Sequence, residues 1–349
     1  MDEATLTALA FGDPPLIGAR LLSGDVPGTP PRQRLLTAIV LGARGRYAAA
    51  TTLLDRLRRE PDPVVASFAG STLASHRRQL GGHAAARKLD GAALLLVGAG
   101  AYGAQPDSGP GHPTGDPKGA VRHPADPDSA GLPTAVTDAA DPASADPGGA
   151  RTGATPVDRS AAVGTNRASF EPDGLDVAGA RADALLGLAA DNLALGRLGA
   201  ARRLAVRAAQ ADRRWRAAVR GGWVAAEIEL ADGQHANAVA PARRALEIAR
   251  VRGARRHAVK SAIVLGVALT AAGEEGALEL LGVALEEAEK YELHSLTWVA
   301  AQVTADLDTG HAERYRFRSR EVLHAVLRQA DPCVMRIARE SPWVPAGAG

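Results

Sequence analysis

The sequence has a single cysteine, Cys333, among 349 residues. One thiol cannot form an internal disulfide, which excludes the class of small disulfide-stabilised secreted domains and favours a reducing, cytoplasmic compartment. The opening residues Met1, Asp2 and Glu3 lack the basic region of a secretory signal. The longest apolar run, residues 91–104, is glycine-rich and too short to span a bilayer, so no membrane association is predicted.

Aromatic residues are also scarce, at 3%, although hydrophobic residues make up 46% of the chain. Abundant alanine with few β-branched and aromatic residues favours closely packed helices over a sheet, so we predict an all-α fold. The excess of Ala, Arg, Gly and Asp is typical of a GC-rich bacterial genome. The net charge of +2 by itself indicates no class of partner.

Catalytic motifs are absent from the sequence. It has no Gly-x-Ser-x-Gly elbow, no P-loop and no His-Glu-x-x-His, and its nine histidines are scattered. Residues 98–103 match the glycine pattern of a dinucleotide site, but a helical pattern precedes them where a strand is required. We interpret them as a helix end, and predict no enzyme activity, no catalytic residue, no cofactor and no metal site.

The composition divides the chain into five parts. Residues 1–31 predict short capping helices, one of them from Glu3 to Phe11, and residues 32–97 predict two helical hairpins. Residues 98–175 are rich in Pro, Gly and Asp, with ten acidic and five basic residues, and predict a disordered linker. Residues 176–340 predict further hairpins, and residues 341–349 a flexible tail.

Glycines mark the turns of these hairpins at a nearly constant spacing. Gly45 and Gly81 are 36 residues apart, and the later turn glycines are spaced by 37, 40 and 37 residues: Gly196, Gly233, Gly273 and Gly310. A fixed period of two helices indicates a right-handed α-solenoid of about five to six hairpins, each turn glycine adopting the left-handed conformation. Two hairpins are too few to be stable alone, so we predict that the hairpin ending near Val97 packs on the helix starting near Asp176.

The repeat resembles the tetratricopeptide repeat (TPR), in which Ala follows the turn Gly by five and twelve positions. The matching sets here are Gly81, Ala86 and Ala93; Gly196, Ala201 and Ala208; and Gly233, Ala238 and Ala245. The resemblance implies an interaction scaffold. Some TPR proteins bind a terminal carboxylate through a polar clamp on the inner helices; the corresponding positions here, such as Leu186, Ala190 and Val224, are apolar, so recognition of an acidic C-terminus is not predicted.

Charge is distributed unevenly along the repeats. Residues 197–260 hold fifteen basic and five acidic residues, whereas residues 270–310 hold nine acidic residues and one lysine. Solvated helix faces account for such a pattern. The alternative is an electrostatic groove for an acidic segment, including the chain's own linker, or for nucleic acid. The candidate partner-binding residues are Arg203, Arg207, Arg213, Arg214, Trp215, Arg216, Arg220, Arg243, Arg244, Arg255, Arg256 and Lys260.

Two functions remain open at this point. The first is a non-enzymatic scaffold or adaptor that binds a protein segment in a concave basic groove. The second is a nucleic-acid-associated regulator that uses the Arg-rich repeats, with Trp215 as a stacking platform. Trp223 and Trp298 are expected in the core.

Overall fold

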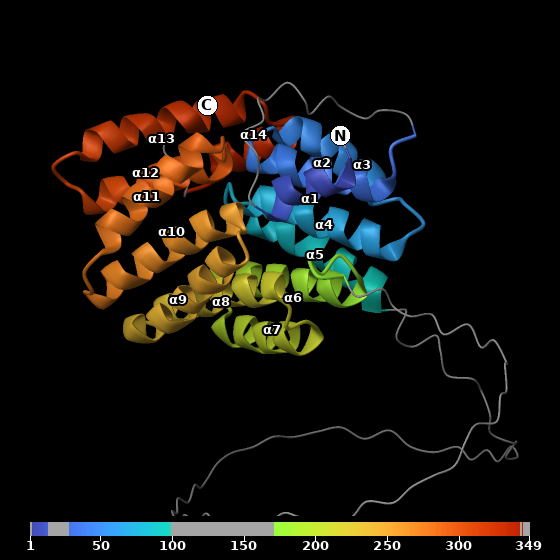
Figure 1. Cartoon of the computed structure of the whole chain (residues 1–349), viewed down its shortest axis with the longest axis horizontal. Helices are drawn as coiled ribbons and strands as arrows, with labels where there is room; N and C mark the ends of the chain where they lie inside the picture. The colour runs from blue at the N-terminus through green and yellow to red at the C-terminus, as the bar shows by residue number, and fades with distance from the viewer. Residues whose placement is uncertain (1, 13–27, 99–170, 343, 345–349) are drawn as a thin grey trace, which may run out of the picture. The chain divides into compact units, whose positions relative to one another are not determined.

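The computed structural model describes residues 2–12, 28–98, 171–342 and 344. Every regular element in these ranges is a helix, which confirms the all-α prediction. Figure 1 shows the fourteen helices: α1 (Glu3–Phe11), α2 (Pro31–Ala43), α3 (Tyr47–Leu57), α4 (Pro63–Arg78), α5 (His83–Gly98), α6 (Val177–Ala194), α7 (Leu198–Ala211), α8 (Trp215–Ala231), α9 (His235–Val251), α10 (Arg255–Ala272), α11 (Ala277–Lys290), α12 (His294–Leu307), α13 (Ala312–Leu327) and α14 (Pro332–Glu340).

Aspartate N-caps fix where several helices begin. Asp62 accepts hydrogen bonds from the backbone of Val64 and Val65 at the start of α4, and Asp176 accepts one from Gly179 at the start of α6. Asp331 does the same for α14. The Asp331-Pro332 pair follows the sixth hairpin. It also starts a further helix, because Asp caps the free N–H groups and Pro suits the first turn.

The predicted turn glycines have the predicted backbone in five of six hairpins. Gly45, Gly81, Gly196, Gly233 and Gly273 have φ of 71–86°, the left-handed region. The prediction is wrong for Gly310, where the carboxylate of Asp308 instead accepts a hydrogen bond from the His311 backbone N–H at 3.2 Å.

The alanines of the repeat lie where the two helices of a hairpin meet. Ala86, Ala93, Ala201, Ala208, Ala238 and Ala245 are all at most 1% exposed, as the spacing predicts. A methyl group added to Gly222 of α8 would lie 2.9 Å from the Ala245 Cβ of α9. Small side chains therefore set the helix separation. Trp298 is buried as expected, whereas Trp223 is only partly buried.

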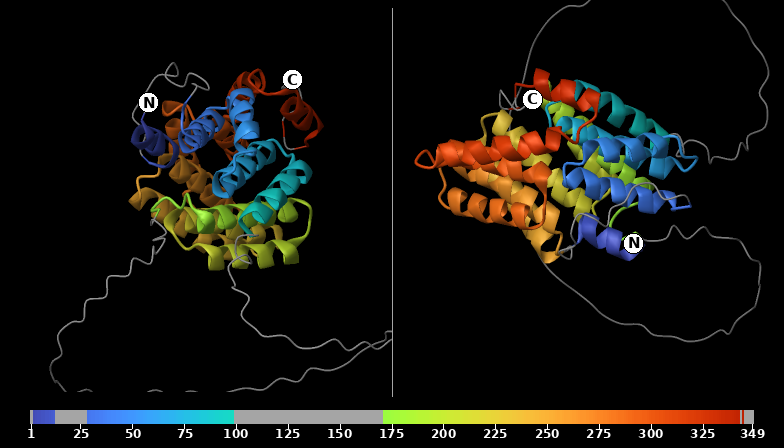
Figure 2. Two further views of the ribbon diagram at one scale, coloured as in Figure 1. Left: turned by 90° about the vertical axis from the view of Figure 1, so that its right-hand side faces the viewer. Right: turned by 90° about the horizontal axis from the view of Figure 1, so that it is seen from above.

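Contacts join the two halves of the chain. Helix α5 packs against α6, as the sequence predicts. The first helices of successive hairpins contact one another in the order α2, α4, α6, α8, α10 and α12. Helix α12 also contacts α2, which the repeat pattern does not predict. The side view in Figure 2 shows the C-terminal helices beside the first hairpin.

A seam of specific bonds joins the last hairpin and α14 to the first hairpin. The Ala48 N–H donates to the Gln329 carbonyl at 2.8 Å, and Thr51 Oγ1 donates to Asp331 Oδ2 at 3.0 Å. Tyr47 is fully buried in a cluster with Trp298, Leu323 and Val326. The first and last hairpins therefore share one core.

The predicted linker, residues 98–175, lies mostly outside the described residues. Its last five residues are described, and for them the prediction of disorder is wrong: Leu175 is 6% exposed, and residues 171–174 are held by hydrogen bonds. The second short N-terminal helix, expected to end near Leu22, lies outside the described residues, as does most of the tail. Gly98 ends α5, so a helix does precede the glycine pattern at residues 98–103.

Candidate functional site

The twelve predicted binding residues separate into two groups in the structure. The exposed group lies on α7, on α9 and before α8: Arg203, Arg207, Arg213, Arg243 and Arg244. The other seven lie on or next to α8 and α10 and are partly or fully buried: Arg214, Trp215, Arg216, Arg220, Arg255, Arg256 and Lys260. The structure thus does not bring the predicted set together as one accessible surface.

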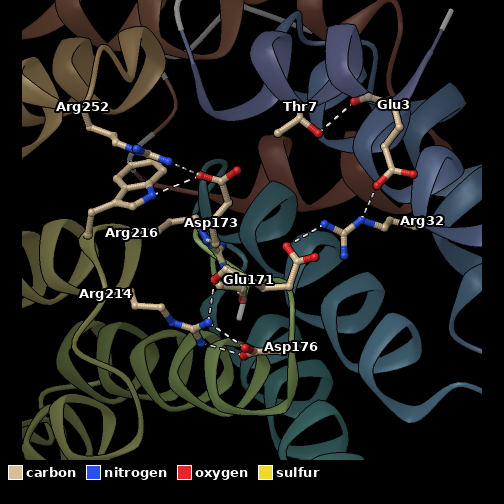
Figure 3. Close-up of polar contacts among 11 residues, drawn as sticks. Glu3, Thr7, Arg32, Glu171, Asp173, Asp176, Arg214, Arg216 and Arg252 are labelled. Carbon is tan, nitrogen blue, oxygen red and sulfur yellow. Dashed lines mark hydrogen bonds and ion pairs between the residues drawn. The ribbon is translucent and has the colours of Figure 1, made fainter. Parts of the chain in front are cut away.

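Three residues of the buried group, Arg214, Trp215 and Arg216, contact an acidic stretch of the chain itself, residues 171–174, which we call the acidic clasp. Arg214 Nη1 donates to the Glu171 carbonyl at 2.7 Å, and Arg216 Nε donates to the Asp173 carbonyl at 2.8 Å. Trp215 Nε1 donates to Asp173 Oδ1 at 3.2 Å. Three successive residues at the start of α8 therefore bind the main chain and a carboxylate of this segment, which is a turn closed by the Gly174 N–H donating to the Glu171 carbonyl at 3.0 Å (Figure 3).

Side chains from two further elements also bind the acidic clasp. Arg32 of α2 bridges Glu171 at 2.8 Å and Glu3 of α1 at 2.6 Å. Arg252, at the end of α9, pairs with Asp173 at 3.2 Å and lies over the Trp215 ring, 5.8 Å from its centroid. Figure 3 shows these side chains pointing at the clasp from separate helices. Paired carboxylates and bonded carbonyls explain why this end of the linker is ordered.

Trp215 was predicted as a free stacking platform, and the structure assigns its ring to internal contacts. Its ring meets the His257 ring edge-on, with centroids 5.0 Å apart, and Trp223 stacks on the same imidazole at 5.6 Å. His257 is 5% exposed, and burial among Arg256 and other cations lowers its pKa well below the usual value. The imidazole is therefore a neutral part of the packing.

Deeper in the molecule, four side chains form what we call the inner cationic cluster: Arg216, Arg220, Arg256 and Lys260. Asp183 of α6 bridges two of them, with Arg216 at 2.7 Å and Arg220 at 2.6 Å. The Arg216 guanidinium also lies 5.3 Å from the ring centroids of both Phe11 and Phe68. Arg216 is 5% exposed and already paired with Asp183, so it is not the freely accessible side chain that the sequence predicts.

The remaining two cations of the cluster, Arg256 and Lys260, have fewer carboxylates nearby to offset their charge. Burial and the nearby Arg220 lower the pKa of Arg256 to about 10. Burial lowers the pKa of Lys260, Arg220 and Arg256 add to that shift, and Glu227 opposes it. Lys260 Nζ lies 4.8 Å from the Trp223 ring centroid. Among the described residues, neither Arg256 nor Lys260 forms an ion pair within 4.0 Å of a carboxylate.

A separate acidic pair flanks this cluster. Arg78 of α4 pairs with Asp191 of α6 at 2.7 Å and also with Asp90 of α5. Both carboxylates are almost fully buried, and burial together with the neighbouring Asp191 raises the pKa of Asp90. The sequence analysis missed Arg78, Asp90, Asp183 and Asp191. The available signal was a lone aspartate among the alanines and leucines of a predicted buried helix face.

The basic and acidic blocks of the sequence are partly paired with each other. Arg243 of α9 pairs with Glu274, and Arg255 of α10 pairs with Glu287 of α11. Arg318 of α13, which lies outside the basic block, pairs with Glu289 of the acidic block. The predicted separation of charge along the array is therefore reduced at these pairs.

No protein-family model and no curated protein matches the chain. Within the described ranges, no three His, Cys, Asp or Glu side chains are grouped so that they could hold a metal ion. None of the described helices is both long and apolar enough to cross a membrane. The clasp contacts and the inner cationic cluster are thus the features from which a function is argued.

Proposed function

We propose that this chain is a non-enzymatic, TPR-like helical-repeat adaptor that binds a short acidic segment of another protein. The hairpin period, the left-handed turn glycines and the buried alanines of each hairpin support the repeat architecture. Such hairpins offer rigid helix starts on which several side chains converge, and this favours the binding of a peptide segment.

One observation carries the proposal: the acidic clasp is itself an acidic segment, folded as a turn, that is bound by three of the predicted residues together with Arg252 and Arg32. Arg214 and Arg216 donate hydrogen bonds to its backbone carbonyls. Trp215 donates to the Asp173 carboxylate, and Arg252 and Arg32 form ion pairs with its carboxylates. Backbone carbonyl contacts fix the path of a segment without reading its side chains, and arginine–carboxylate contacts select acidic ones. The same chemistry would accept a partner segment of similar charge.

In this proposal the clasp occupies the site in cis, and a partner segment competes with it. Glu171 and Asp173 are the replaceable anchors, because their carboxylates bind arginines that are themselves partly exposed: Arg32 at 31% and Arg252 at 46% of the side chain. Leu175 and the N-cap Asp176 would stay in place, since they belong to the packing of α6.

The test is the affinity of the full chain for a fluorescent peptide that copies residues 169–176. In the double variant E171Q/D173N the cis segment is weakened, so we expect peptide affinity to rise on the order of tenfold, equivalent to about 1.4 kcal/mol. Adding R252Q should remove that gain, whereas R244Q, on the exposed face of α9, should not. Equal affinity in the wild-type chain and the double variant would contradict competition in cis.

A second candidate function, nucleic-acid association, is supported by the exposed arginines. Among the described residues, Arg203, Arg207 and Arg244 have no acidic partner. Phosphate contacts by such side chains give an affinity that falls steeply with salt. Retention of the chain on generic duplex DNA at low salt, lost in R203Q/R207Q/R244Q, would favour this function. Peptide binding without any DNA retention would favour the adaptor function.

A further inference from the structure

We propose that the inner cationic cluster is a binding site for a small multivalent oxyanion of the phosphate type. This site is separate from the acidic clasp and goes beyond the adaptor function. It consists of Arg220, Arg256 and Lys260, supplied by α8 and α10.

The cluster carries uncompensated positive charge. The four cations of the cluster face two carboxylates, Asp183 and Glu227, which leaves two positive charges in excess. When the neighbouring Arg78 is counted together with its partners Asp90 and Asp191, one positive charge remains in excess. A largely desolvated cation without a counter-charge is unfavourable, and Arg256 and Lys260 are partly buried, so this arrangement is stabilised when an anion supplies that charge.

Neighbouring side chains hold two of the cations in place. Asp183 fixes Arg220 at 2.6 Å, and the Trp223 ring lies under Lys260 at 4.8 Å, while Trp223 is itself held by its hydrogen bond to Ser261 Oγ at 2.7 Å. These contacts position the donors without using all of their N–H groups. A guanidinium presents five donors and an ammonium three, so Arg220 and Lys260 keep free donors for a ligand.

The donor types of the cluster fit a phosphate-type ligand. Two guanidinium groups and one ammonium match an oxyanion that has several equivalent oxygens, because Arg binds phosphate in a bidentate manner and Lys acts as a point charge. All three cations retain some solvent exposure, and the Arg220 side chain is 19% exposed. A small anion can therefore reach the donors, whereas a protein segment would require more exposed surface.

The experiment measures the thermal midpoint of the full chain with inorganic pyrophosphate, against sodium chloride at equal ionic strength. A ligand that binds only the folded chain, at about one hundred times its Kd, raises Tm by roughly 5–10 °C for a unit of this size. We expect this rise in the wild-type chain and in R244M. We expect it to be lost in R256M and K260M.

Two further readouts keep the test decisive. R256M removes a charge without a partner, so its Tm in the absence of anion should equal or exceed that of the wild-type chain, and its helical circular dichroism should be unchanged. Pyrophosphate should also change the fluorescence of Trp223, which packs on Lys260, and W223F should lose this change. No rise in the wild-type chain, or an equal rise in R256M and R244M, would overturn the site.

Discussion

Arg214 forms a two-point bond with Asp176: Nη1 donates to Oδ2 and Nη2 donates to Oδ1, each at 2.6 Å. The same guanidinium also bonds Asp212, and these hydrogen bonds, with that of Asp176 first, raise the pKa of Arg214 above its usual value. Asp176 is the N-cap of α6 and Arg214 precedes α8. The pair therefore ties the start of one hairpin to the start of the next.

We predict that R214K lowers the free energy of unfolding by about 1–3 kcal/mol, because lysine keeps the charge but cannot form the two-point bond with Asp176. Urea denaturation followed by circular dichroism measures this change. R207K, an exposed arginine on α7, is the matched control and should stay within about 0.5 kcal/mol of the wild-type chain. Equal effects of the two substitutions would mean that the two-point bond between Arg214 and Asp176 adds no stability.

The local features of the fold could be predicted from the sequence. The turn glycines and the alanines that follow them place the hairpins correctly because both report local geometry: a left-handed turn and a close helix approach. The α2–α12 contact could not be predicted, since it brings together residues such as Arg44 and His294, which are 250 positions apart. No periodic pattern contains that information.

For the candidate site, the sequence could predict which residues are basic but not which of them are exposed. Arg203 and Arg216 look alike in a charge count, yet the first is exposed on α7 and the second is buried against Asp183. What separates them is the position of single aspartates on other helices, which depends on tertiary packing. The sequence analysis identified the arginines and the acidic linker as possible partners, but expected disorder where Glu171 and Asp173 are bound.

Helix separation in the fourth hairpin depends on Gly222. A Cβ at this position would lie 2.8 Å from the Pro241 carbonyl oxygen and 2.9 Å from the Ala245 Cβ, whereas nothing lies within 4 Å of a Cβ at the adjacent Gly221. Both glycines are inside α8. We predict that G222A destabilises by about 1–3 kcal/mol through overpacking, and that G221A stabilises by roughly 0.5–1 kcal/mol through helix propensity.

Thermal denaturation of the two variants checks this pair. Opposite shifts in Tm are expected, although both substitutions are Gly→Ala in neighbouring positions of one helix. Two upward shifts would show that propensity outweighs packing here and that α8 and α9 can move apart without loss.

We expect the buried His76 to make the free energy of unfolding depend on pH. It is 2% exposed, its Nδ1 has no hydrogen-bond partner among the described residues, and burial, aided by the charge of Arg256, lowers its pKa to about 3. In the unfolded chain the group titrates near 6.5. Between these values the unfolded state binds more protons, so acid reduces the free energy of unfolding, by at most about 1.4 kcal/mol per pH unit for this group.

The stability contributed by the neutral His76 is therefore fully present above pH 6.5 and is lost as the pH falls toward 3. The raised pKa of Asp90 acts in the opposite sense over part of this range. The test therefore compares variants: H76L should show a shallower loss of stability from pH 6.5 to 4 than the wild-type chain. Parallel curves would show that His76 does not stay neutral in the folded chain.

Asp331 connects the last helix to the first hairpin, and two substitutions separate its two roles. Its carboxylate accepts hydrogen bonds from the backbone N–H groups of Cys333 and Val334 at 2.9 and 3.0 Å, and from Thr51 Oγ1 at 3.0 Å. T51V removes only the bond to α3, at a cost of about 0.5–1.5 kcal/mol. D331A removes that bond and the N-cap, so its cost should be larger by about 0.5–2 kcal/mol. Hydrogen exchange should show faster opening of α14 in D331A than in T51V, since the cap holds the first turn of that helix, and equal rates would place the whole effect in the bond to Thr51.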